Sequence, residues 1–255
     1  MATIIDLSKT IEYSKSDPWF MRVKIKHKSH ASAHFLIRFF IGLPEKLFPD
    51  RFIGWADDTI KQMGVHATTH MDAPWHYGSV CENKKAKTID EIPLEWCYGN
   101  GVVLDLSHKK DNDSITQKDI TDALTHINYT ICKNDIVLIR TGRDTFIGTK
   151  EYPHRGTGMS KEATHYLIQQ GVKVMGIDQW GWDLPLKYQA QLAKKTQNKT
   201  TFWEGHLVGL DHEYCHMEQL VNLSALPSTG FKICVFPLKI KGASAAPARV
   251  VAIIE

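Results

Sequence analysis

The 255-residue chain lacks the features that mark a membrane protein or a nucleic-acid-binding protein. No apolar run approaches the roughly 18 residues that a membrane-spanning helix needs. No basic block is longer than a pair such as Lys84-Lys85, and the formal net charge is only +3, so the charge pattern that binds nucleic acid is missing. The amino terminus also lacks the charged and apolar segments of a secretory leader. We therefore expect a cytoplasmic protein that binds neither membranes nor nucleic acid.

Cysteine pairs and linkers are missing as well. The five cysteines are an odd number and include no Cys-x-x-Cys pair, which argues against a disulfide framework and against a thiolate zinc site. The sequence has no internal repeat and no segment rich in proline, glycine or serine, and its length suits one large domain. We predict a single domain over residues 1–255.

Short apolar runs alternate with amphipathic segments through the middle of the chain. Thr116, with Asp119 three residues later, resembles a capping box and precedes an apolar helical spacing. Ser160 and Gly171 suit the first and last positions of a second helix. Buried strands are expected around these helices, at residues 101–106, 135–140 and 172–178. This alternation is typical of α/β proteins with a parallel or mixed sheet.

The flanking regions give weaker patterns. Strands are expected at residues 3–7, 20–26, 231–240 and 249–254, and helices at 186–195 and 217–223. Residues 28–55 mix histidine, aromatic residues and two prolines without a clean period. We interpret them as a loop with a short helix that covers a site.

The densest group of metal-ligand types lies between His66 and His76, in the sequence HATTHMDAPWH. Three imidazoles and one carboxylate fall within eleven residues, and borderline divalent metals prefer these ligand types. His70 and Asp72 are two residues apart and would share one face of an extended segment, with His66 close enough to join them. The alternative is a chance cluster, because the chain contains 13 histidines.

A second pattern, His212-Glu213-Tyr-Cys-His216, matches the His-Glu-x-x-His motif of zinc proteases. Such a site needs a further protein ligand downstream, yet residues 219–254 contain no His, Asp or Glu. We interpret the match as a coincidence, with His212 and His216 as polar residues that flank a helix.

More distant ligands are available for the first cluster. Glu218 begins an apolar run, and His206 stands twelve residues before it, after a glycine that allows close approach of the backbone. The pattern His-x-x-Thr-His-x-Asp-x-Pro-x-His, followed by this His and Glu, resembles the cyclase family that includes kynurenine formamidase and isatin hydrolase. The Asp-Leu-Ser opening at Asp6 and the Gly-Ile-Asp at Gly176 add to the resemblance, which extends over most of the chain.

The resemblance implies specific roles. His66, His70 and Asp72 would bind a first divalent metal, Mn or Zn, and His206 a second, with Asp72 and Glu218 shared where two ions bind. His76 would be the acid/base, its alternative role being to orient Asp72. The sequence departs from the family at Thr68, where glycine is usual. The family also implies a swivelling β/α/β-type mixed sheet with flanking helices.

Aromatic and basic residues near these motifs suggest how a substrate is held. Trp75, Trp180 and Trp182 would wall an aromatic substrate, or else belong to the core. Arg140 and Arg143 bracket a Thr-Gly at a predicted strand end, where they would hold a product carboxylate or form structural ion pairs.

We predict a metal-dependent hydrolase that cleaves an amide, cyclic imide or lactam-type C–N bond by metal-activated water. The first alternative is a cyclase or dehydratase acting on an aromatic or polyketide-like substrate with the same metal. The second is a binding protein that uses the metal only to stabilise its fold. We expect a small, aromatic substrate and a homodimer or homotetramer.

Overall fold

The computed structural model describes residues 2–255. Its contacts divide the described residues into two compact units, one formed by residues 2–10 and 65–255 and the other by residues 11–64. The second unit contains strands β2 (Lys24–Lys28) and β3 (Asp57–Gln62), which pair antiparallel, and helix α1 (His30–Leu36) between them. The short helix predicted within residues 28–55 is therefore present. The strand expected at residues 20–26 begins later, at Lys24.

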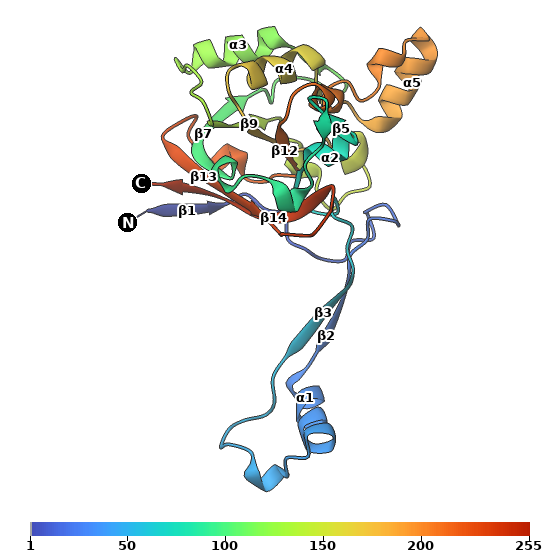
Figure 1. Cartoon of the computed structure of the whole chain (residues 1–255), viewed down its shortest axis with the longest axis vertical. Coiled ribbons are helices and arrows are strands. Elements are labelled where there is room, and N and C mark those ends of the chain that lie inside the picture. The colour runs from blue at the N-terminus through green and yellow to red at the C-terminus, as the bar shows by residue number, and fades with distance from the viewer. Residues whose placement is uncertain (1) are drawn as a thin grey trace. The chain divides into compact units, whose positions relative to one another are not determined.

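The larger unit is built on a closed, mixed β-barrel (Figure 1). Its strands are β4 (His70–Asp72), β7 (Tyr98–Asp105), β9 (Ile136–Arg140), β11 (Val174–Ile177), β12 (Cys215–Glu218), β13 (Phe231–Pro237) and β14 (Ala245–Ile254). The central strands β7, β9, β11 and β12 are parallel to one another. The barrel closes because β4 pairs antiparallel with both β12 and β14. Strand β1 (Thr3–Asp6) adds to β14 beside β4.

Two helices cover the parallel strands, α3 (Gln117–His126) and α4 (Lys161–Gln169), which lie side by side in Figure 1. Strand β9 shows how the two faces differ: Leu138 joins the core inside the barrel, whereas Val137 and Ile139 pack toward the helices. The predicted caps are present, because Thr116 forms a capping box and the Ser160 side chain accepts from the backbone N–H of Ala163.

The remaining α-helices and strands of this unit are a third longer helix, α5 (Leu186–Thr196), and several elements of two to four residues. The short elements are α2 (Pro74–Tyr77), β5 (Val80–Cys81), β6 (Lys84–Lys85), β8 (Ser114–Ile115) and β10 (Gly158–Met159). Within the described residues, no helix combines the length and the apolar character needed to cross a membrane.

The predicted α/β class and mixed sheet are confirmed, and one element is wrong. Residues 217–223 were expected to form a helix, but residues up to Glu218 belong to strand β12. The chain then turns, because Gln219 and Asn222 have φ angles of 59° and 61°, which a right-handed helix does not allow. A short apolar run supports either element equally well, and pairing with β4 and β11 selects the strand.

Candidate metal centre

Two paired strands supply the centre of the site. In the antiparallel register of β4 and β12, Asp72 lies opposite His216 and His70 opposite Glu218. Alternate residues of a strand point to opposite faces, so the methionines between them, Met71 and Met217, join the core inside the barrel. The other face of the two strands therefore carries four imidazole and carboxylate side chains, those of His70, Asp72, His216 and Glu218.

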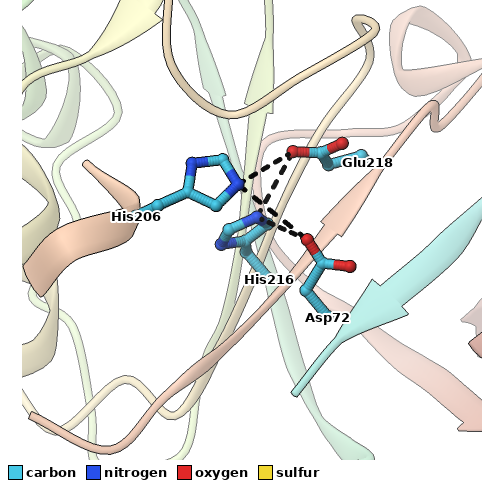
Figure 2. A group of neighbouring side chains, drawn as sticks. All are labelled: Asp72, His206, His216 and Glu218. Carbon is cyan, nitrogen blue, oxygen red and sulfur yellow. Dashed lines mark ion pairs between the residues drawn. The ribbon is translucent and has the colours of Figure 1, made fainter. Parts of the chain in front are cut away.

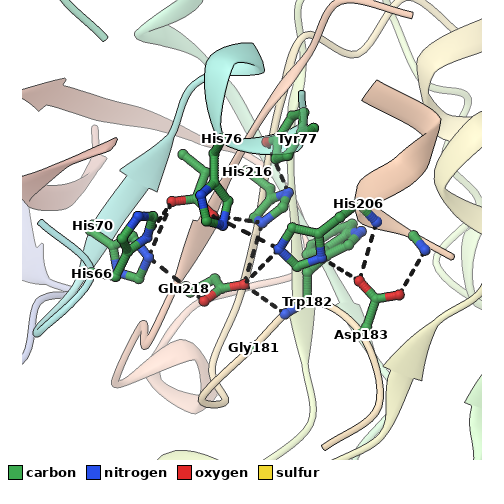
Figure 3. Close-up of polar contacts among 12 residues, drawn as sticks. His66, His70, His76, Tyr77, Gly181, Trp182, Asp183, His206, His216 and Glu218 are labelled. Atoms are coloured by element: carbon green, nitrogen blue, oxygen red, sulfur yellow. Dashed lines mark hydrogen bonds and ion pairs between the residues drawn. The ribbon is translucent and has the colours of Figure 1, made fainter. Parts of the chain in front are cut away.

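The other predicted site residues come from segments around these strands. His66 lies in the loop before β4, and His76 lies on α2, where Pro74 occupies the first turn. His206 opens a short 3-10 turn, His206–Leu210, directly after Gly205. The structure thus brings all six predicted site residues together (Figure 3).

Asp72 is the centre of this arrangement. Its Oδ1 lies 2.9 Å from His66 Nδ1 and 3.3 Å from His70 Nε2. Its Oδ2 lies 3.2 Å from His216 Nε2, 3.6 Å from His76 Nε2 and 4.0 Å from His206 Nε2. The carboxylate is fully buried, so each of its two oxygens faces a different group of imidazoles.

Glu218 divides its oxygens in the same way. Its Oε2 lies 3.6 Å from His70 Nε2, while its Oε1 lies 3.6 Å from His206 Nε2 and 3.3 Å from His216 Nε2. The backbone N–H of Trp182 donates to Oε1 at 2.8 Å, which fixes the carboxylate in place.

His216 is the residue that the sequence interpretation misplaced. It was assigned to a helix flank outside the site, but it lies on β12 and is fully buried against Asp72 and Glu218 (Figure 2). His212 does lie apart, with its ring stacked on His165 at 4.6 Å. The His-Glu-x-x-His segment is therefore not a protease helix. The missed signal was the His216-x-Glu218 spacing, because residues two apart share one face of a strand.

Hydrogen bonds orient the imidazoles. The Nδ1–H of His70 donates to the carbonyl oxygen of Thr68 at 2.6 Å, and that of His206 donates to the Asp183 carboxylate. These bonds leave each Nε2 directed at the carboxylates, as supporting contacts do around metal-binding histidines. Thr68, which replaces the usual glycine, does not have a positive φ, so it fits this backbone without strain.

The residues present fit a divalent metal. His70 Nε2, His216 Nε2 and both Asp72 oxygens are buried and have no hydrogen-bond partner, which is costly unless a cation compensates. Ligand atoms of Asp72, His206, His216 and Glu218 all lie within 4.8 Å of one another. Imidazole nitrogen with carboxylate oxygen is a donor set that suits Zn and Mn ions.

The close packing of imidazoles and carboxylates shifts the pKa values of both kinds of group. Burial would raise the pKa of Asp72, but the neighbouring imidazoles, His70 foremost, hold it well below its ordinary value of 3.8. Burial alone would lower the pKa of His216, but its contacts with Asp72 and Glu218 outweigh burial and raise it to about 9. The metal-free cluster therefore holds a proton on His216 at neutral pH.

The pKa of His76 is shifted in the opposite direction to that of His216. Burial lowers its pKa, Asp72 opposes this, and the imidazoles of His66 and His206 reinforce it, which gives a pKa of about 4. The side chain is 24% exposed and makes no hydrogen bond with Asp72 at 3.6 Å. His76 is thus a neutral base at the edge of the cluster, with access to solvent.

The three tryptophans that the sequence singled out lie in different surroundings. Trp182 is fully buried and stacks on His216 with centroids 4.9 Å apart, Trp180 packs edge-on against Tyr152, and Trp75 lies at the surface. Trp203, which the sequence did not single out, stacks on His206 at 4.4 Å and contacts His76 edge-on at 5.3 Å. Of these four aromatic residues, only Trp203 contacts the ring of His76.

The two arginines near the predicted strand end are committed to ion pairs. Arg140 binds Asp105 at 2.5 Å, and Arg143 binds Asp111 at 3.1 Å. The structural alternative considered for them therefore holds.

A closed mixed barrel that carries a buried cluster of histidines and carboxylates defines an α/β protein with a set of side chains that could hold a divalent metal. Residues 5–184 match the model of the family described as Putative cyclase, and the chain belongs to this family. The family resemblance that the motifs indicated is thus confirmed. A kynurenine formamidase of Salinibacter ruber (strain DSM 13855 / M31) is 26% identical over 193 residues, which are 74% of this chain and 76% of that protein.

Solved structures share the fold. Isatin hydrolase A from Labrenzia aggregata, bound to benzyl benzoate, superimposes with a TM-score of 0.74 at 24% identity, over 99% of this chain and 94% of that chain. A predicted metal-dependent hydrolase from Bacillus stearothermophilus gives a TM-score of 0.64 at 22% identity, over the full length of both chains. At these identities the likeness establishes the fold alone.

Proposed function

We propose that this member of the cyclase family is a metal-dependent hydrolase that opens an amide, cyclic imide or lactam-type C–N bond. The observation that carries the proposal is the buried cluster around Asp72, because its nitrogen and oxygen atoms without hydrogen-bond partners suit the coordination of a divalent ion. The neutral His76 lies beside this cluster. The names of the relatives, kynurenine formamidase and isatin hydrolase, support a substrate with such a bond.

The ligands we propose are those that the sequence predicted. His66, His70 and Asp72 hold a first ion and His206 contributes to a second, with Asp72 and Glu218 shared between them. We propose Mn or Zn because imidazole and carboxylate ligands suit both. When bound, such an ion lowers the pKa of a coordinated water toward about 7 and polarises a carbonyl oxygen.

His76 performs the proton transfers. With its pKa lowered to about 4, the imidazole is neutral at neutral pH, and in the tautomer with the proton on Nδ1 its Nε2 accepts the proton of the attacking water. The same atom then delivers the proton to the leaving nitrogen. Asp72, 3.6 Å from Nε2, stabilises the imidazolium that exists between the two transfers.

Trp203 offers a flat apolar surface beside His76, which supports a small aromatic substrate. We place the reacting bond next to His76 and the aromatic ring of the substrate toward Trp203. Trp75 remains a candidate for the outer wall because it is 36% exposed. Trp182 instead supports His216 from within the core.

We also propose a homodimer or homotetramer. Residues 11–64 carry exposed apolar side chains, among them Phe35, Phe39, Phe40 and Ile41. Contiguous exposed apolar surface is typical of interfaces. A cytoplasmic location and the action of residues 1–255 as one domain stay predictions.

Metal analysis followed by a substrate panel tests the proposal. Protein purified without chelators is assayed for bound metals and then for hydrolysis of aryl formamides, isatin-like imides and lactones. We expect a bound divalent ion, and we expect His70→Ala to lose metal and activity together while His212→Ala keeps both. Absence of metal, or an active and metal-loaded His70→Ala variant, contradicts the proposal. Reaction in heavy-oxygen water separates hydrolysis, which incorporates the label, from a cyclase or dehydratase reaction, which does not.

A further inference from the structure

We propose that His216 is a fourth protein ligand of the second metal position, and that the more exposed first position is the one that water and substrate reach. The inference rests on the proposed function, because it assumes that the cluster binds divalent ions. It adds a ligand to the predicted set and assigns different roles to the two positions.

The oxygens of the two carboxylates define the two positions. Asp72 Oδ1 and Glu218 Oε2 face His70, and Asp72 Oδ1 also faces His66. Asp72 Oδ2 and Glu218 Oε1 face His206 and His216 instead. Ligand atoms of Asp72, His206, His216 and Glu218 all lie within 4.8 Å of one another, so two imidazole nitrogens and one oxygen from each carboxylate surround the second position.

The orientation of His216 is that of a ligand. Its Nδ1–H is directed at the Tyr77 hydroxyl, 3.1 Å away, and its ring lies between Tyr77 and Trp182, with centroid distances of 5.2 and 4.9 Å (Figure 3). These contacts fix the ring and direct Nε2 at Asp72 and Glu218. That nitrogen is buried and has no hydrogen-bond partner.

The distances around His216 match a tetrahedral ion. Zinc bonds of about 2.0–2.1 Å to nitrogen and oxygen place the ligand atoms of a tetrahedron about 3.3–3.4 Å apart. His216 Nε2 lies 3.2 Å from Asp72 Oδ2 and 3.3 Å from Glu218 Oε1. His206 Nε2 is further away, at 3.6 Å from the same Glu218 oxygen and 4.0 Å from Asp72 Oδ2, so the close match is that of His216.

The two positions differ in access to solvent. Around the second position, the side chains of His206 and His216 are 5% and 0% exposed. Around the first position, His70 is also buried, but His66 is 27% exposed and lies beside the partly exposed His76. An ion bound by His216 would therefore hold Asp72 and Glu218 in place, and water and substrate would approach from the side of His66.

The test compares His216→Phe, which retains an aromatic ring between Tyr77 and Trp182 but has no donor nitrogen, with His212→Phe as the matched control. Chelator-treated protein is reconstituted with Co²⁺, and bound ions per chain are measured together with visible absorption, which is intense for tetrahedral cobalt. We expect His216→Phe to bind one ion fewer than the wild type and to lose the intense absorption. His212→Phe should match the wild type.

A second variant tests the assignment independently in case His216→Phe does not fold. Tyr77→Phe keeps His216 but removes the hydroxyl that its Nδ1–H bonds, and we expect it to weaken the tetrahedral cobalt site about 10- to 100-fold. Unchanged stoichiometry and spectrum in His216→Phe, or unchanged affinity in Tyr77→Phe, overturn the assignment of His216. A wild-type protein that binds no divalent ion overturns the proposed function itself.

Discussion

Asp183 offers a demanding test of how the cluster is organised. Its carboxylate accepts hydrogen bonds from the backbone N–H of Gly205 at 2.7 Å, from that of His206 at 3.1 Å, and from Nδ1–H of the His206 ring. The ring bond fixes the tautomer in which His206 Nε2 has a free lone pair. The Asp183→Asn variant keeps the shape of the side chain but removes its negative charge and replaces one acceptor oxygen with a donor NH₂ group.

The expected loss follows from these bonds. One amide atom of the asparagine is an NH₂ group, which donates and does not accept. Placed at Oδ2, it opposes the backbone N–H of His206 and favours the tautomer with the proton on Nε2, which no longer binds a metal. Loss of such a supporting contact typically lowers metal affinity about 10- to 100-fold, which is about 1.4–2.8 kcal/mol.

Calorimetric titration of Zn²⁺ into chelator-treated protein measures this effect. The matched control is Glu204→Gln, which removes a neighbouring carboxylate that interacts with the backbone of Lys161 rather than with His206. We expect weaker binding of one ion in Asp183→Asn and wild-type binding in the control. A folded Asp183→Asn protein that binds both ions within twofold of the wild type would refute the tautomer argument.

Further predictions concern protonation, catalysis and the core. In the metal-free protein, the raised pKa of His216, about 9, stabilises the fold below the ordinary value of 6.5, and about 3 kcal/mol of this is lost as the pH rises to about 9. Denaturant unfolding across that range should show the fall, and a rise in stability would contradict it. His76→Ala should lower kcat about 10²- to 10⁴-fold at unchanged metal content; an unaffected kcat in a metal-loaded variant rules out the acid/base role. Leu138→Ala, inside the barrel, should cost about 2–5 kcal/mol of unfolding free energy, whereas Leu186→Ala, at an exposed position, should change it by about 0.5 kcal/mol or less. Equal effects of the two would show that the barrel interior is not the main core.

The sequence predicted what depends on local pattern. The caps at Thr116 and Ser160 formed as expected because a capping side chain needs only the backbone a few residues ahead. The extended segment that presents His70 and Asp72 was also found, because residues two apart share a face in any strand. These are short-range relations that a single sequence contains in full.

The features that the sequence did not predict depend on long-range pairing. Closure of the barrel requires β4 to pair with two strands that lie far away in the chain, and no local pattern encodes those partners. His216 was missed for the same reason, because its apolar neighbours suit a helix as well as a strand. Trp203 was missed because its contact with His76 joins a loop to helix α2, which lies far away in the sequence.

The closure of the barrel also explains how a strand of three residues can hold ligands precisely. A slip of one residue in the pairing of β4 would move Met71 to the face of the metal centre. The same slip would turn the side chains of His70 and Asp72 into the barrel. Pairing with β12 alone is short, but β14 fixes the same register from the other side, where Ala245 pairs with Asp72. The backbone N–H of Ala73 also donates to the carbonyl of Ser244 at 2.9 Å. The strands that close the barrel are therefore the ones that place Asp72 between the two metal positions.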